Sequence, residues 1–280
     1  MRVVLAELAP ALGDLSANLD RIATIVENVP AELAVFPELF LSGYRVGDDV
    51  RRLALAPGDA AQRRLSDIAG RTHCAILVGA PLVSANRPGE TLNAALLFTP
   101  DGQVTAQGKR FLPSFGPFEE GTVFTPVDAS RVAGVGPATI GMQICYDLFF
   151  AEVARDLAMQ GADLLVAISA APVTSRRLFD RLLPARAIEN AIPLVYVNRV
   201  GAEDGIVFGG GSAAVDVRGE TLTGAEVPFE KRAAGERVEL VEIDLGSARR
   251  WRPFRPVLRD ASRRAPEPVR NSPSAGGPAA

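Results

Sequence analysis

The sequence predicts an α/β domain, because short apolar runs alternate along the chain with stretches whose apolar residues recur at the period of a helix. Of the 280 residues, 48 % are hydrophobic and 22 % charged, which is enough apolar material for a large core. We therefore expect one large domain over residues 1–260, or two at most. Residues 261–280 contain four Pro, two Gly and one large apolar residue, Val269, and are expected to form a disordered tail.

Four strands and two helices are expected in the first half of the chain. Apolar runs predict strands at residues 2–8, 33–36, 74–82 and 92–99. A helix over about residues 16–27 carries four apolar residues near one face: Leu19, Ile22, Ile25 and Val26. A second helix, over residues 59–69, is expected to end at Gly70, since glycine commonly terminates helices. Asp101–Gly102 then predicts a hairpin turn.

The second half of the chain repeats this alternation. Apolar runs predict strands at residues 139–144, 164–168, 194–198, 212–217 and 237–243. A sharp turn at residues 145–147 leads into a helix over residues 150–160. A helical stretch between the strands at 164–168 and 194–198 contains Pro184, which is expected to interrupt it. No short-period repeat is present.

Charge, cysteine content and hydropathy limit the class of partner. The formal net charge of −3 offers no overall attraction to nucleic acid or to an anionic membrane. No apolar run reaches the ~18 to 20 residues of a membrane helix, and Glu7 interrupts the N-terminus before a signal-peptide core could form. Two Cys are too few for a disulfide framework, which favours a reducing compartment. We therefore expect a cytoplasmic protein that binds neither nucleic acid nor membrane.

Cys145 is the first candidate for chemistry. It lies at a strand-to-helix turn, where a side chain is presented at the carboxyl edge of a sheet and a helix N-terminus can lower the thiol pKa. The alternative is a buried structural cysteine, and Cys74, inside an apolar run, fits that alternative. The chain contains a single His, His73, so any mechanism with a histidine base would depend on it and a zinc site with several His ligands is excluded.

Glu38 and Lys109 are the next candidates. Glu38 follows an apolar run and stands among Phe36, Leu39 and Phe40, so burial would raise its pKa unless it is paired; the alternative is an exposed loop carboxylate. Lys109 is one of only two Lys beside 28 Arg. A lysine in such a chain suggests a need for a compact ammonium that a guanidinium cannot replace, although chance remains an alternative.

Together these residues resemble the catalytic motifs of the nitrilase, or carbon-nitrogen hydrolase, superfamily. The resemblance covers roughly residues 2–256, and the three motifs are separated by 71 and 36 residues. The segments that carry it are Val35-Phe36-Pro37-Glu38, Gly108-Lys109 with Leu112-Pro113, Ile144-Cys145-Tyr146-Asp147, Arg186-Ala-Ile-Glu-Asn190 and Gly209-Gly-Gly-Ser212. The resemblance implies a four-layer α-β-β-α sandwich that forms a homodimer through its outer helices, or a higher homo-oligomer.

The resemblance also implies roles for individual residues. Glu38, Lys109 and Cys145 match the family's catalytic set, and Glu120, rather than its neighbour Glu119, matches a second glutamate that positions the lysine or the substrate. Arg186 and Glu189 match a supporting segment and are expected to be structural. No metal and no organic cofactor are implied.

Free Glu and Cys differ by ~4 pKa units, so the site must bring the two groups closer in proton affinity. We expect burial to raise the pKa of Glu38. We expect the Lys109 ammonium and a helix N-terminus beside Cys145 to stabilise the thiolate. Cys145 would attack an amide carbonyl, Lys109 and the backbone N–H of Tyr146 would hold the oxyanion, and Glu38 would move the proton.

The residues after the cysteine bear on the substrate. Tyr146-Asp147 stands where nitrile-cleaving relatives commonly have Trp-Glu, which favours a small-molecule amide, and Leu148-Phe149 stands where amino-acid carbamoylases place arginines. We therefore expect an apolar acyl pocket. Its expected lining is Phe115, Phe118, Tyr146 and Phe149, unless these aromatics belong to an ordinary core.

Three alternatives remain open. Residues 112–120 also resemble the glutaminase domain of glutamine-dependent NAD synthetases, in which case the protein would supply ammonia to a separate synthetase. A nitrilase is the second alternative. A catalytically inactive binding or scaffold protein is the third, and it is disfavoured because all three catalytic positions are occupied.

Overall fold

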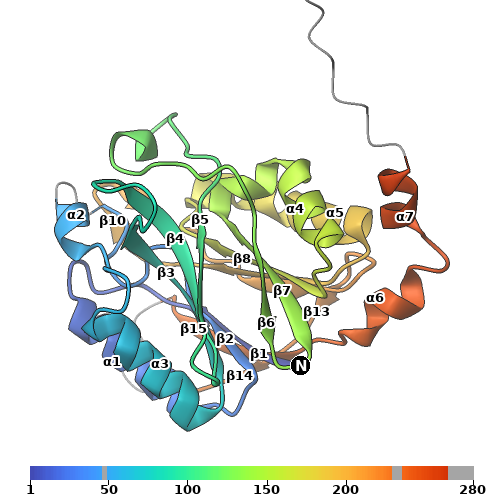
Figure 1. Ribbon diagram of the computed structural model, residues 1–280, viewed down its shortest axis with the longest axis horizontal. Coiled ribbons are helices and arrows are strands. Elements are labelled where there is room, and N and C mark those ends of the chain that lie inside the picture. The colour runs from blue at the N-terminus through green and yellow to red at the C-terminus, as the bar shows by residue number, and fades with distance from the viewer. Residues whose placement is uncertain (46–48, 229–234, 264–280) are drawn as a thin grey trace, which may run out of the picture.

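Two β-sheets form the centre of the molecule, and helices cover the outer face of each (Figure 1). The computed structural model describes residues 1–45, 49–228 and 235–263. In the described residues the first sheet has seven strands, in the order β14 (Ala225–Glu226), β15 (Arg237–Glu242), β1 (Arg2–Glu7), β2 (Leu33–Val35), β3 (Ala75–Val83), β4 (Thr91–Phe98) and β5 (Val104–Gly108). Strands β1, β2 and β3 run parallel, and the others pair antiparallel with their neighbours.

The second sheet is built in the same style. In the described part of the chain it has six strands, in the order β13 (Thr221–Leu222), β12 (Ala213–Val215), β9 (Leu194–Asn198), β8 (Leu164–Ser169), β7 (Ala138–Ile144) and β6 (Val132–Val135). Strands β7, β8 and β9 run parallel. A separate hairpin of β10 (Ala202–Glu203) and β11 (Ile206–Val207) follows β9.

Helices occupy the outer faces and the connections. The α-helices are α1 (Leu15–Asn28), α2 (Val50–Leu53), α3 (Ala60–Thr72), α4 (Ala151–Met159), α5 (Arg176–Asn190), α6 (Gly246–Trp251) and α7 (Val257–Ser262). The 3-10 helices are η2 (Glu120–Thr122), η3 (Cys145–Phe149) and η4 (Val173–Ser175). Asp14 and Asp59 accept hydrogen bonds from the first turns of α1 and α3, which explains where these two helices begin.

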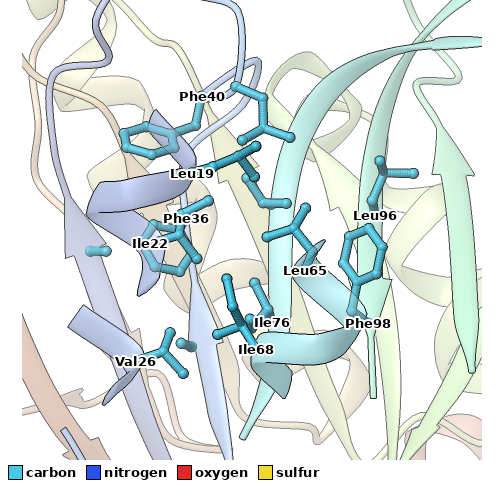
Figure 2. Close-up of a cluster of buried hydrophobic side chains, with 14 of the residues drawn as sticks. Leu19, Ile22, Val26, Phe36, Phe40, Leu65, Ile68, Ile76, Leu96 and Phe98 are labelled. Carbon is cyan, nitrogen blue, oxygen red and sulfur yellow. The ribbon is translucent and has the colours of Figure 1, made fainter. Parts of the chain in front are cut away.

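Three apolar cores hold four layers together. The first core joins α1 and α3 to the outer face of the seven-stranded sheet, and Figure 2 shows Ile22, Ile68 and Phe98 among its side chains. The second core lies between the two sheets, where strand residues such as Leu97 and Ile168 are fully buried. The third joins α4 and α5 to the six-stranded sheet. The expected α-β-β-α sandwich is therefore confirmed.

Two expectations about helix ends are wrong. Helix α3 continues through Gly70, which has room in the helix, and ends at His73, whose φ of 54° takes the left-handed conformation expected of the glycine. Pro184 lies inside α5 without ending it, because buried residues on both sides of it, Leu183 and Ala187, keep the helix packed on its sheet.

The C-terminal end also differs from the expectation in detail. Helix α7 extends to Ser262, so the first two residues assigned to the tail are helical. Residues 264–280, which make up the rest of the expected tail, lie outside the described residues.

Candidate active site

The carboxyl ends of strands from both sheets meet at one place. Strand β5 is antiparallel to β4, which is antiparallel to β3, so β5 ends at the same edge as β2 and β3. Glu38 follows β2 and Lys109 follows β5 at this edge, while Cys145 follows β7 in the other sheet. The topology therefore brings together three residues that are up to 107 positions apart in sequence.

Lys109 is held between two carboxylates. Its Nζ donates to Glu38 Oε1 at 2.7 Å and to Glu120 Oε1 at 2.6 Å, and all three side chains are buried. Burial alone would lower the pKa of Lys109, but the carboxylates of Glu120 and Glu38 raise it above its ordinary value. Burial and Glu38 raise the pKa of Glu120, against the opposing effect of Lys109. Lys109 therefore stays a charged, fixed donor.

Glu38 also connects the two sheets. Its Oε1 accepts from Asn93 Nδ2 on β4 at 2.7 Å, and its Oε2 accepts from the backbone N–H of Ala170, just after β8, at 2.7 Å. Asn93 donates as well to Glu120 Oε2 at 3.3 Å. The carboxylate is thus fixed from both sheets by charged and neutral donors.

The turn that carries Cys145 has an uncommon backbone conformation. Cys145 begins η3 with a φ of 48°, in the left-handed region, directly after the extended strand β7. Asp147 holds this turn, because its carboxylate accepts from the backbone N–H of Ile144 at 3.0 Å, of Arg110 at 3.1 Å and of Phe111 at 2.9 Å. The same carboxylate therefore ties the cysteine turn to the segment after Lys109.

The thiol pKa differs from the expectation. Burial, and then the Glu38 carboxylate, raise the pKa of the Cys145 thiol, and the nearby Lys109 ammonium offsets only part of this. Helix α4 begins at Ala151, six residues after Cys145, so the expected helix N-terminus does not lie at the thiol. The resting group is therefore a thiol, and its proton must leave as the sulfur reacts.

Cys145 opens onto a small apolar pocket of about 110 Å³. Among the described residues its lining contains no charged side chain: Tyr44, Pro113, Phe115, Phe118, Cys145, Tyr146, Phe149, Ala171, Pro172, Ser175, Leu178 and Phe179. The ring of Tyr146 lies 5.2 Å from that of Phe115 and 5.4 Å from that of Phe149, centroid to centroid. The four aromatics expected from the sequence thus line one pocket beside the thiol, and of these four Phe115 and Phe149 are exposed.

The remaining residues considered from the sequence lie away from the pocket. His73 precedes β3 and is exposed at the amino end of that strand, the edge opposite the site. Glu119 is exposed, unlike Glu120, and Cys74 is buried in the outer core. Arg186 donates to the carbonyl of Leu148 at 2.9 Å, so it supports the cysteine turn from behind.

Sequence reasoning missed three contributors: Asn93, Tyr44 and the backbone of Ala170. The hydroxyl of Tyr44 donates to Glu120 Oε1. None of these residues belongs to a motif quoted from the sequence. Asn93, a buried amide inside a strand, was the one detectable signal, because such a group needs polar partners.

Residues 2–253 match the family model described as carbon-nitrogen hydrolase. The chain belongs to the carbon-nitrogen hydrolase family. This family assignment covers both sheets and every catalytic candidate. An amidase of Nesterenkonia AN1 from the nitrilase superfamily, solved as a mutant, is 30 % identical, superposes with a TM-score of 0.74, and is matched over 91 % of this chain and 95 % of that one.

Curated relatives in the family have different names. An (R)-stereoselective amidase of Pseudomonas sp is 31 % identical, over 93 % of this chain and 91 % of the relative. A glutamine-dependent NAD(+) synthetase of Thermotoga maritima is also 31 % identical, over 88 % of this chain. This chain spans 42 % of the length of that synthetase.

Neither a metal-binding cluster nor a membrane-spanning helix occurs in the described residues. Among residues 1–45, 49–228 and 235–263, no three His, Cys, Asp or Glu side chains gather as a metal-binding group. No helix in the same part of the chain combines the length and the apolar character of a membrane span.

Proposed function

We propose that the protein is an amidase that hydrolyses a small apolar carboxamide to a carboxylic acid and ammonia through a thioester on Cys145. One observation carries this proposal: a buried ammonium, Lys109, fixed between Glu38 and Glu120, lies beside a cysteine that opens onto an apolar pocket. Cys145 is the proposed nucleophile, Glu38 the base and Lys109 the oxyanion donor, and acyl transfer requires these three groups.

In the first half of the reaction, Cys145 Sγ attacks the amide carbon and its proton passes to Glu38. The carbonyl π electrons move to oxygen, and the oxyanion is bound by Lys109 Nζ and the backbone N–H of Tyr146. An ammonium has three N–H groups, and since Glu38 and Glu120 accept two of those of Lys109, the third is available to the oxyanion. The C–N bond then breaks as Glu38 returns the proton to the departing nitrogen, which leaves as ammonia.

In the second half, Glu38 takes a proton from water, whose oxygen attacks the thioester carbon. The C–S bond breaks, the acid leaves, and the proton returns to Cys145. Because the pKa of the thiol is raised, no thiolate forms beforehand, and Glu38 removes the proton while the sulfur attacks. This scheme uses neither a metal nor an organic cofactor, and Glu120 positions Lys109.

The pocket favours an apolar acyl group. Its volume of about 110 Å³ is small, which favours a small acyl group. A charged substrate group would lose its hydration there without gaining a partner, since the described lining is uncharged. Phe115, Tyr146 and Phe149 are the proposed substrate-binding residues. The match to an (R)-stereoselective amidase over most of both chains supports the same class of reaction.

A glutaminase that supplies ammonia to a separate synthetase is the second candidate, because several curated relatives are glutamine-dependent NAD(+) synthetases. Glutamine carries an α-ammonium and an α-carboxylate, and the described pocket lining offers no charged partner for either. We therefore rank it below the apolar amide.

An ammonia-release screen tests the proposal. Purified protein is offered aliphatic and aromatic amides, glutamine, carbamoyl amino acids and nitriles, and intact mass is recorded during turnover. We expect release of ammonia from apolar amides and an acyl adduct on Cys145. The Cys145→Ala variant should keep its fold and lose both signals, whereas Cys74→Ala should keep both.

The same screen separates the alternatives. Release of ammonia from glutamine alone would establish the glutaminase, and a preference for nitriles would show that the inference from Tyr146-Asp147 is wrong. A folded protein that releases no ammonia and forms no adduct with any of these compounds would refute the proposed amidase.

A further inference from the structure

The segment after β9 contains a buried ion pair that the proposed mechanism does not use. The guanidinium of Arg199 pairs with the carboxylate of Glu203, and the two side chains are only 1 % and 5 % exposed. Removing both charges from water is costly, so a pair at this depth calls for an explanation beyond stability.

Glu203 binds the backbone of a segment that is distant in sequence. Its Oε2 accepts from the backbone N–H of Tyr44 at 2.9 Å and from that of Arg45 at 2.8 Å. Its other oxygen faces Arg199. The ion pair therefore fixes the main chain at the point where the Tyr44 side chain leaves it.

Tyr44 continues this connection into the active site. Its hydroxyl donates to Glu120 Oε1, the oxygen that also accepts from Lys109 Nζ at 2.6 Å. Its ring contacts the ring of Phe208, with centroids 5.9 Å apart, and the Arg199 guanidinium lies 4.0 Å from the centroid of Phe208. Both the backbone and the ring of Tyr44 are thus held by the same ion pair.

We propose that Arg199 and Glu203 are positioning residues, which hold Tyr44 so that its hydroxyl keeps Glu120 against Lys109. This inference rests on the proposed amidase function, because it assigns the pair to the Lys109 centre. The pair is hydrogen-bonded to Tyr44, which also lines the pocket, so its proposed effect on turnover passes through that residue.

A double-mutant cycle tests the proposal. Tyr44→Phe and Glu203→Gln should each lower kcat/KM about tenfold, the effect of one lost hydrogen bond to a charged group. If Glu203 acts through the Tyr44 hydroxyl, adding Glu203→Gln to Tyr44→Phe should lower kcat/KM by less than about a further twofold. Asp204→Asn is the matched control, since Asp204 is exposed in the same hairpin and its side chain binds the side chain of Arg45. It should leave kcat/KM unchanged.

The pH profile gives a readout that a purely structural role would not move. The titratable and charged groups facing Glu120 are Lys109, Glu38, Tyr44 and Cys145, and the amide of Asn93 also faces it. A hydrogen bond from Tyr44 favours the charged form of Glu120, so losing it raises the pKa of Glu120 further. The acid limb of kcat/KM should therefore move to higher pH in Tyr44→Phe and Glu203→Gln, and not in Asp204→Asn.

A second variant and a second readout show whether a negative result comes from misfolding, from a wrong amidase assignment or from a wrong role for Arg199 and Glu203. If Glu203→Gln does not fold, the double variant Arg199→Met with Glu203→Leu removes both charges at once. This double variant then takes the place of Glu203→Gln in the double-mutant cycle. If wild-type protein hydrolyses no amide, the alkylation rate of Cys145 by iodoacetamide replaces kcat/KM, and it should fall equally in Tyr44→Phe and Glu203→Gln because a loosened Lys109 stabilises thiolate less.

Two results overturn the proposal. One is a folded Glu203 variant whose rate and acid limb equal those of wild type. The other is independence of Glu203 and Tyr44, with losses that multiply to about a hundredfold in the combined variant.

Discussion

At the scale of single residues, the shape of the Lys109 cation is decisive. Its ammonium fits between two carboxylates with no exposed surface, a place that a planar guanidinium cannot occupy in the same way. We expect Lys109→Arg to lower kcat/KM by at least about a hundredfold, comparable to the loss of an oxyanion donor. Steady-state kinetics on the best amide from the screen measure this.

The neighbouring residue supplies the control for that prediction. Arg110→Lys makes the opposite exchange at a side chain whose partners are Ser130 and Asp156. This variant should keep activity close to that of wild type. Equal activity of Lys109→Arg and Arg110→Lys would contradict the assigned role of Lys109.

The raised thiol pKa gives a second residue-scale prediction. Because the negative charge of Glu38 helps to raise the pKa of Cys145, Glu38→Gln should lower that pKa while it abolishes amide hydrolysis. The midpoint of iodoacetamide alkylation against pH, followed by intact mass, should therefore move to lower pH. Cys74 is buried in the outer core, where iodoacetamide does not reach it, whereas Cys145 lines the pocket.

Glu119→Gln is the matched control for charge, since Glu119 is exposed and separate from Lys109. Its alkylation midpoint should equal that of wild type. A midpoint that stays in place or rises in Glu38→Gln would show that the Glu38 charge does not act on the thiol.

At the scale of elements, the turn after β2 depends on a glycine in the next strand. A Cβ on Gly79 of β3 would lie 2.3 Å from the backbone N of Leu39 and 2.5 Å from Cα of Glu38. Gly79→Ala must therefore push the Glu38 backbone away, and we expect it to destabilise the fold by about 2 kcal/mol and to lower kcat. Chemical denaturation and kinetics measure the two effects.

Gly134 offers the comparison, because a Cβ there meets no atom within 4 Å. Gly134→Ala in β6 should be neutral, or stabilising by up to about 1 kcal/mol through the unfolded chain. If the two alanine variants have the same stability and activity, close contact at Gly79 does not position Glu38.

The sequence predicts an element when the pattern that specifies it lies within the element itself, and not when contacts between distant residues specify it. The strands that precede Glu38 and Cys145 were predictable, because apolar runs mark them. Strand β5, which precedes Lys109, was not predicted, because its sequence Val-Thr-Ala-Gln-Gly is not an apolar run. Strands of two residues, such as β10 and β13, are too short to show a period. The contact between Tyr44 and Glu203 spans 159 residues, and no local pattern encodes it.

At the scale of the whole molecule, the outer helices expose apolar side chains. Met159 at the end of α4 and Ile188 on α5 are 48 % and 38 % exposed. They support the proposed homodimer through the outer helices, since a stable interface needs such surface. Sedimentation equilibrium at micromolar concentration should give twice the monomer mass of 29.6 kDa.

Substitutions on two faces locate that interface. Met159→Glu with Ile188→Glu should produce monomers, whereas Val104→Glu, at an exposed position of β5 in the other sheet, should leave the mass unchanged. A monomeric wild-type protein under these conditions would refute the dimer.

The charge of the buried cluster around Lys109 has a consequence for the end of the catalytic cycle. Glu38 and Glu120 set two carboxyl groups against the single ammonium of Lys109, so the ammonium is already paired on both sides. The acid formed by the proposed hydrolysis becomes an anion in the same place. An anion in a poorly solvated site is unfavourable without a cation of its own, so we expect the product to leave readily and to inhibit turnover only weakly.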